Sequence, residues 1–267
     1  MGTLAIALCA FVAAGLTLLS GFGLGTLLMP VVALFFPVEI AVSVTAVVHL
    51  ANNLFKLALV GWRADRGVVL RFGIPAVLAA FAGALTLGWL AHLPPLAEYS
   101  LLGRTLAVMP VKLTVGLLIL GFVAMELSPA MAAWRFDARL LPVGGCVSGF
   151  FGGLSGNQGA FRSMFLLKTG LSKEQFIATG VVLAVIVDLA RMPVYGVAFF
   201  KSGPPVDLML VVVACLAAFA GSFLAARLLK KLTIRSLQFI VGMLLILVAF
   251  GMIDRKSTRL NSSHANI

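Results

Sequence analysis

Hydrophobic residues along this chain form long segments that are separated by short polar stretches. The segments lie at about 3–19, 22–36, 38–60, 70–92, 108–126, 141–154, 158–167, 172–199, 206–229 and 235–253. A helix that crosses a bilayer needs roughly 20 consecutive apolar residues, and most of the segments approach that length. The pattern therefore predicts an all-α, polytopic bundle of membrane helices.

Two of the segments are too short to cross a bilayer. Residues 141–154 and 158–167 would reach only about two thirds and about half of the apolar core at a rise of 1.5 Å per residue. Between them lies the glycine-rich and polar sequence GGLSGNQGAFRS, residues 152–163. We expect two half-helices that flank a break. Segments 3–19 and 22–36 are interrupted in a similar way by SGFGLG.

The two glycine-broken pairs indicate an internal repeat. At an offset of about 134–135 residues, SGFGLGTLLMP aligns with GGLSGNQGAFRSM, and Asn53–Lys56 aligns with Asp188–Arg191. Three longer spans follow each pair, and a hairpin plus an odd number of crossings inverts the second half relative to the first. The expected repeats are residues 1–126 and 127–253.

The basic residues are consistent with this topology under the positive-inside rule. The hairpin arrangement places most of them on the cytoplasmic side: Arg63, Arg66, Arg71, Arg135, Arg139, Lys168, Lys173, Arg227, Lys230, Lys231 and Arg235. Only Arg104 and Lys201 fall on the opposite side. Residues 254–267 are polar and lack periodicity, so we expect a disordered or non-native tail.

Composition supports a membrane protein and excludes other classes. Hydrophobic residues make up 61% of the chain and charged residues 11%, and the mean hydropathy is +1.12. The net charge of +11 comes mainly from loops beside apolar segments, so we do not expect nucleic-acid binding. Cys9, Cys146 and Cys215 are isolated and apolar in context, which predicts neither disulfides nor a metal site. No cofactor is expected.

The break near residue 156 has the chemistry of an anion site. Irregular backbone at bilayer depth survives only where protein or a water-filled cavity surrounds it, and the start of a half-helix presents free N–H groups with a positive dipole. Arg162 adds a permanent charge whose planar fork fits an oxyanion. We expect a small carboxylate, sulfite or sulfonate to bind Ser155, Gly156, Asn157, Gln158, Gly159, Arg162, Gly23, Gly25 and Asn53.

A structural interpretation of the same residues stays open. The glycines can serve close helix packing, and Asn157 and Gln158 can cap the break. Arg162 favours a functional role, because an unpaired guanidinium is costly to bury in a membrane.

Other polar residues within the spans are candidates for proton coupling or gating, each with an alternative. Asp188 and Arg191 can form a structural ion pair or a proton-linked switch. His49 can shuttle protons or pack as a satisfied core residue.

Lys56 can line the cavity, with Asn52 and Asn53, or reach the cytoplasmic headgroups. Thr45 and Thr179 are expected to bond back to their own helices.

No catalytic pattern of an enzyme is present: the sequence lacks a nucleophile elbow, a zinc-protease motif and a phosphate-binding loop. Transport would then draw on an ion gradient, with alternating access between the two repeats. A passive anion channel that uses the same positive helix ends is the alternative. The partners are a small anion and the lipid bilayer, and the oligomeric state, a homo-oligomer included, is open.

Two motifs resemble those of the sulfite exporter TauE/SafE family of membrane permeases: GFGLGTLLMP at Gly21–Pro30 and, more distinctively, GGLSGNQGAFRSMFL at Gly152–Leu166. The first motif departs from the family's consecutive glycines, because Leu24 stands between Gly23 and Gly25. The resemblance extends over nearly the whole apolar chain. It implies a carrier of sulfite, sulfonates and related organosulfur anions in the cytoplasmic (inner) membrane.

Overall fold

The computed structural model describes residues 2–20, 24–101, 104–128, 130, 134–201 and 208–228. The elements are α1 (Gly2–Ser20), α2 (Leu24–Ala33), α3 (Val38–Val60), η1 (Gly61–Arg63), α4 (Arg66–His92), β1 (Ala97–Leu101), β2 (Arg104–Val108), α5 (Pro110–Leu127), η2 (Ala138–Leu140), α7 (Leu141–Ser155), α8 (Gly159–Leu166), α9 (Lys173–Lys201) and α10 (Leu208–Leu228). The helices coincide with the predicted apolar segments to within a few residues. The predicted segment 235–253 and the tail 254–267 lie outside the described residues.

The fold is that of an all-α membrane protein. Three of the described helices are long and apolar enough to cross a membrane, over Val38–Ala58, Arg66–His92 and Lys173–Gly196. The helices α7 and α8 have 15 and 8 residues. At 1.5 Å per residue they extend about 22 Å and about 12 Å, less than the apolar thickness of a bilayer, as predicted for half-helices.

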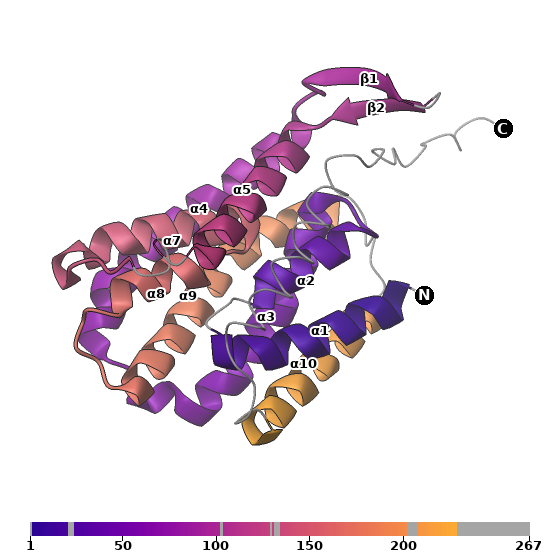
Figure 1. Ribbon diagram of the computed structural model, residues 1–267. Coiled ribbons are helices and arrows are strands. Elements are labelled where there is room, and N and C mark those ends of the chain that lie inside the picture. The colour runs from indigo at the N-terminus through magenta and orange to yellow at the C-terminus, as the bar shows by residue number, and fades with distance from the viewer. Residues whose placement is uncertain are drawn as a thin grey trace.

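The hydrophobic pattern did not predict a short antiparallel hairpin. Strands β1 and β2 pair from Ala97 opposite Val108 to Leu101 opposite Arg104. The hairpin connects α4 to α5 and projects away from the helices (Figure 1). Its strands have five residues each, too few for a periodic signal beside the long apolar segments.

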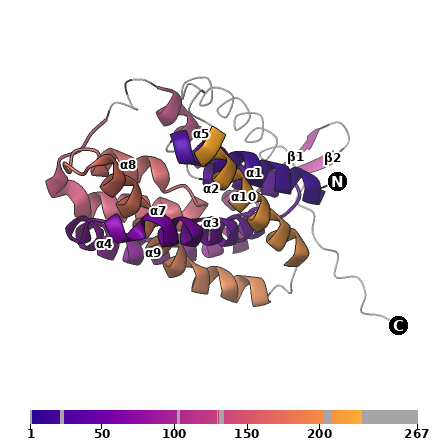
Figure 2. The same ribbon diagram turned by 90° about the horizontal axis from the view of Figure 1, so that it is seen from below.

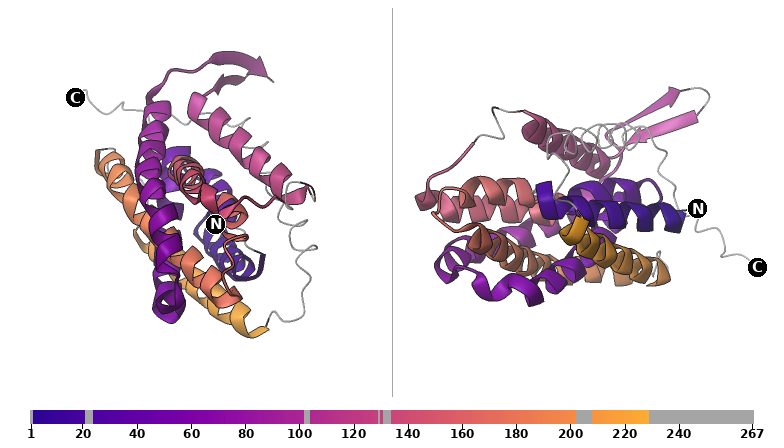
Figure 3. Two further views of the ribbon diagram at one scale, coloured as in Figure 1. Left: turned by 90° about the vertical axis from the view of Figure 1, so that its left-hand side faces the viewer. Right: turned by 60° about the horizontal axis from the view of Figure 1, so that its bottom comes forward.

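Helices from the two halves of the chain pack against each other. Helix α4 packs along α7 at one end of the bundle, α1 packs along α10 at the other, and α3 packs against α9 between them (Figures 1 and 2). Helix α5 lies on the outside, next to α4 and α7 (Figure 3). Segments far apart in sequence thus meet at the centre.

The central helices α3 and α9 run antiparallel. His49 on α3 contacts Asp188 on α9, whereas at the C-terminal end of α3 the backbone N–H of Asp65 donates to Thr179, earlier on α9. Asp65 also caps α4 by accepting from the N–H of Val68 at 2.8 Å. The chain reversal between α3 and α4 is therefore bound to the first half of α9.

A glycine ridge on α7, formed by Gly145, Gly149 and Gly153, allows the backbones of α7 and α4 to touch. A Cβ at these positions would overlap the backbone carbonyl oxygens of Phe72, Ala76 and Ala80, in that order. Small residues four apart are the usual means of close helix contact in membranes. Close helix packing is therefore the role of these three glycines, of which Gly153 belongs to the stretch GGLSGNQGAFRS.

Candidate functional site

The break between the half-helices falls where the sequence predicted it. Gly156 ends α7 in the left-handed conformation, with φ of 81°, and its N–H donates to the carbonyl oxygen of Gly152 at 3.0 Å. A side chain at this φ would be strained, so the turn requires glycine. Helix α8 then begins at Gly159, and the Ser148 hydroxyl holds the turn by donating to the carbonyl oxygen of Gln158 at 2.9 Å.

The first half of the chain approaches this break through Gly25. A Cβ on Gly25 would lie 2.9 Å from the carbonyl oxygen of Gly156 and 3.8 Å from a methyl group of Thr45. The N-terminal turn of α2 therefore contacts the turn between α7 and α8. Gly23, predicted beside Gly25, lies outside the described residues.

A buried ion pair on α9 lies next to the break. Asp188 Oδ1 accepts from Arg191 Nη2 at 2.5 Å and from Arg191 Nε at 3.1 Å, and both side chains are almost fully buried. Gln158 Nε2 lies 3.5 Å from the same oxygen. The predicted pairing of Asp188 with Arg191 is present, and the pair is joined to the break through Gln158.

His49 completes the pair from α3. Its Nδ1 lies 2.6 Å from Asp188 Oδ2, and because an ionised carboxylate only accepts, Nδ1 carries the hydrogen. In neutral His49, Nε2 is then an acceptor, and Asn53 Nδ2 lies 3.2 Å from Nε2 and 3.0 Å from Nδ1. His49 is thus part of an interhelical polar network, which is compatible both with proton transfer and with a satisfied core histidine.

Arg191 and Tyr195 also bind the end of α7. Arg191 Nη1 donates to the carbonyl oxygen of Gly152 at 2.7 Å, and the Tyr195 hydroxyl donates to the carbonyl oxygen of Gly153. These carbonyls belong to the last turn of α7, where helical partners run out and the dipole is negative. The sequence analysis missed Tyr195, although it is four residues after Arg191 and on the same helix face.

Four buried polar atoms around the break have no hydrogen-bond partner among the described residues. They are Thr45 Oγ1, Asn157 Oδ1, Gln158 Oε1 and Arg162 Nη1. Buried polar groups are normally paired, and an unpaired one costs about 1–3 kcal/mol, more if it is charged. Unsatisfied atoms gathered at one break are typical of a site that receives its partner from a ligand.

The remaining predicted residues have roles within the protein. Ser155 donates to the carbonyl oxygen of Phe151 at 3.0 Å, and Asn157 Nδ2 approaches the Ser155 hydroxyl at 3.5 Å. Asn52 faces away from the break, because its Oδ1 accepts from Ser222 on α10 at 2.9 Å.

The expectation for the two threonines was wrong. Thr179 accepts from the Asp65 backbone across the α4–α9 contact, and Thr45 Oγ1 has no partner among the described residues.

Arg162 and Lys56 bring positive charge to the same region. Arg162 Nε lies 3.6 Å from the Cβ position of Gly180 on α9, so the side chain extends from α8 toward α9. Lys56 is half-buried on α3 and interacts electrostatically with Arg162. Lys56 therefore lies within electrostatic range of Arg162.

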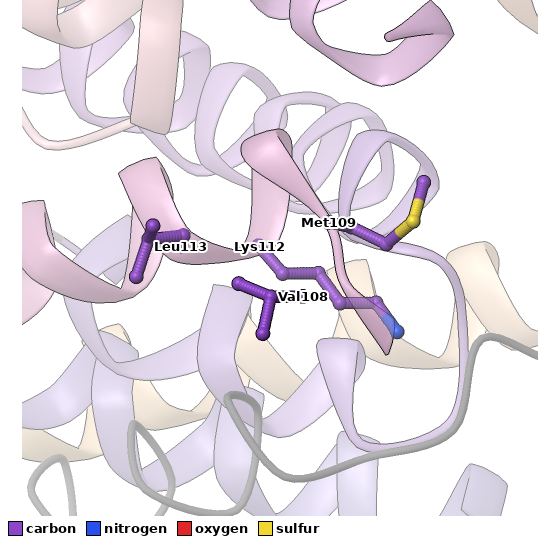
Figure 4. Close-up of a pocket in the computed structure, with 4 residues that line it drawn as sticks. All are labelled: Val108, Met109, Lys112 and Leu113. Carbon is purple, nitrogen blue, oxygen red and sulfur yellow. The ribbon is translucent and has the colours of Figure 1, made fainter. Parts of the chain in front are cut away.

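A surface hollow lies elsewhere, where β2 leads into α5. Val108, Met109, Lys112 and Leu113 line it (Figure 4). None of the predicted site residues takes part, so the hollow does not change the assignment of the site to the break.

Comparison with known families agrees with the motifs. The family described as sulfite exporter TauE/SafE matches residues 6–252, which includes both glycine-broken pairs and every residue of the site. No curated protein matches the chain closely enough to count as a relative.

Proposed function

The chain belongs to the sulfite exporter TauE/SafE family, a family of membrane transporters, and we propose that it is a secondary transporter that moves small sulfur-containing or organic anions, such as sulfite or sulfonates, across the cytoplasmic membrane. One observation carries the proposal: among the residues that the structure describes, Arg162 has a buried Nη1 without a partner, next to the N-terminus of a half-helix that lacks a side-chain cap. Both features favour an oxyanion.

The substrate would bind in the break and be contacted from both halves of the chain. Gly159 at the N-terminus of α8 and Arg162 present backbone and side-chain donors, and Gly156, Gln158, Ser155 and Asn157 border them. Gly23, Gly25 and Asn53 are the contributions proposed from the first half. This assignment is supported by the close approach of Gly25 to Gly156.

Alternating access between two inverted repeats, 1–126 and 127–253, is the proposed mechanism. In the two proposed repeats, α1 corresponds to α7, α2 to α8, α3 to α9 and α4 to α10. A symmetric structure should therefore keep its helix contacts when each helix is replaced by its counterpart. The observed pairs obey this exchange: α1 with α10 becomes α7 with α4, α2 with α3 becomes α8 with α9, and α3 with α9 is unchanged. Such symmetry supports rocking of one repeat against the other around a fixed site.

Proton coupling through His49 and Asp188 is supported by their direct contact. Protonation of His49 at Nε2 would remove the one acceptor of the ring and leave the Asn53 amide nitrogen beside two donors, and rotation of Asn53 would relieve this contact. Asp188 would keep accepting from Nδ1 and from Arg191. A proton would thereby change side-chain positions on α3 next to the break, with Arg191 and Lys56 as the other proposed gating residues.

The test is flux in liposomes that contain the purified protein. Sulfite, taurine and sulfoacetate would be followed under an imposed pH gradient, for the wild type and for Arg162→Gln at matched insertion. Saturable flux that the substitution abolishes supports the proposal. Counterflow of labelled substrate separates a carrier from a channel, because only a carrier exchanges substrate against a gradient of the unlabelled anion.

A further inference from the structure

Helix α3 presents a polar stripe to α9. His49, Asn53 and Lys56 follow one another at spacings of four and three residues, which places them on one helix face. His49 marks the direction of this face, because it contacts Asp188. Lys56 therefore continues the stripe two turns closer to η1.

Lys56 and Arg162 converge on the same part of α9. Because α3 and α9 are antiparallel, the step from His49 to Lys56 corresponds to a step back along α9 from Asp188 toward Gly180. Arg162 extends from α8 to that position, with Nε 3.6 Å from the Cβ position of Gly180. The electrostatic interaction between the two cations agrees with this convergence.

The charges of this region do not balance. Asp188 is already paired with Arg191 and His49, although it also attracts Arg162 over a longer distance. In the part of the chain that the structure describes, neither Arg162 nor Lys56 forms an ion pair with a carboxylate. Two positive charges thus lie within range of each other, Arg162 with a buried Nη1 and Lys56 half-buried, and like charges in a region of reduced dielectric repel.

We propose that the site takes a compact oxyanion in its doubly charged form, with Arg162 donating hydrogen bonds and Lys56 supplying the second positive charge. Lys56 is then a residue that determines specificity between dianions and monoanions. This inference rests on the proposed transport function. The reason is electrostatic: a dianion neutralises both cations, whereas a monoanion leaves one of them uncompensated.

The experiment uses two anions of nearly the same shape and different charge. Thiosulfate is methanesulfonate with a terminal sulfur in place of the methyl group, and at pH 7 the first carries two negative charges and the second carries one. Each is tested as an inhibitor of sulfite flux in liposomes that contain the full-length protein, in the wild type, Lys56→Gln and Lys56→Arg.

The wild type is expected to favour thiosulfate by at least about tenfold in inhibitory concentration, the effect of one further charge contact. Lys56→Gln should remove most of this preference, and Lys56→Arg should keep it. A preference that is unchanged in Lys56→Gln, or a wild type that favours methanesulfonate, would overturn the inference and leave the transport function standing. If the wild type moves none of sulfite, taurine and sulfoacetate, the transport function fails, and this inference fails with it.

Discussion

Arg191 on α9 donates from Nη1 to the carbonyl oxygen of Gly152 at 2.7 Å, and so binds the end of α7 to a helix 39 positions further along the chain. The same guanidinium pairs with Asp188. One side chain therefore gives the Gly152 carbonyl oxygen, which also accepts from Gly156, a second donor and balances the charge of a buried carboxylate. A change in the protonation or position of Asp188 would be transmitted to α7 through Arg191.

Replacement of Arg191 by Met should destabilise the protein strongly. Asp188 would remain buried without its ion-pair partner, and loss of one member of a buried pair costs about 3–5 kcal/mol. The double variant Asp188→Asn, Arg191→Met should recover part of the loss. Thermal unfolding in detergent would measure both, and equal stability of the single and double variants would contradict the pairing.

Tyr195→Phe should weaken the connection between α9 and α7 without a change in packing volume. The carbonyl oxygen of Gly153 would lose a buried donor, at a cost of about 1–3 kcal/mol. Hydrogen exchange of α7 amides, read by mass spectrometry, should speed up near the break more than in α1. Uniform exchange across the two helices would show that the hydroxyl does not hold the break.

Arg162→Gln should separate function from stability. The substitution removes a buried N–H that lacks a partner among the described residues, so the melting temperature should stay the same or rise. Sulfite flux should fall by at least about tenfold, because a charge-assisted hydrogen bond to the oxyanion is lost. Arg162→Lys, which keeps the charge, should retain part of the flux. A large loss of stability together with normal flux would make Arg162 structural.

Asp188→Asn is expected to uncouple transport from the proton gradient. The carboxamide lacks the negative charge that favours protonated His49, whereas exchange of labelled for unlabelled sulfite needs no net proton movement. Counterflow should therefore persist and flux driven by a pH gradient should disappear. Proton-driven flux at the wild-type rate would exclude Asp188 as the coupling group.

Gly149→Ala tests the glycine ridge, and Gly88→Ala is its matched control. A Cβ on Gly149 would overlap the backbone of Ala76, whereas one on Gly88 meets no atom of the described residues within 4 Å. We expect Gly149→Ala to lower the thermal stability clearly. Gly88→Ala should leave it unchanged or raise it by roughly 0.5–1 kcal/mol, because alanine favours the helix. Similar effects of the two substitutions would argue against backbone contact between α4 and α7.

Much of the fold follows from the lengths of the apolar segments alone. The boundaries of α3 were predicted from the length of its apolar segment. The break between α7 and α8 was predicted because each segment is too short to cross the membrane and the sequence between them is rich in glycine. The hairpin of β1 and β2 was not predicted, since its pairing depends on a partner strand that no helical period reveals.

The residues of the site could be predicted from the sequence, but most of the contacts between them could not. The sequence placed Asp188 beside Arg191 because three residues make less than one helix turn. The contact of His49 with Asp188 could not be predicted, because it joins helices 139 residues apart. The roles of Thr179 and Tyr195 depend in the same way on which helices become neighbours.

The glycine ridge of α7 has a genetic consequence. Every missense change in a glycine codon adds at least a Cβ, and at Gly145, Gly149 and Gly153 that atom has no room beside α4. Only synonymous nucleotide substitutions are therefore expected to be tolerated at these three codons. The contact between α1 and α10 has the same limit at Gly221 on α10, where a Cβ would overlap the backbone of Phe11.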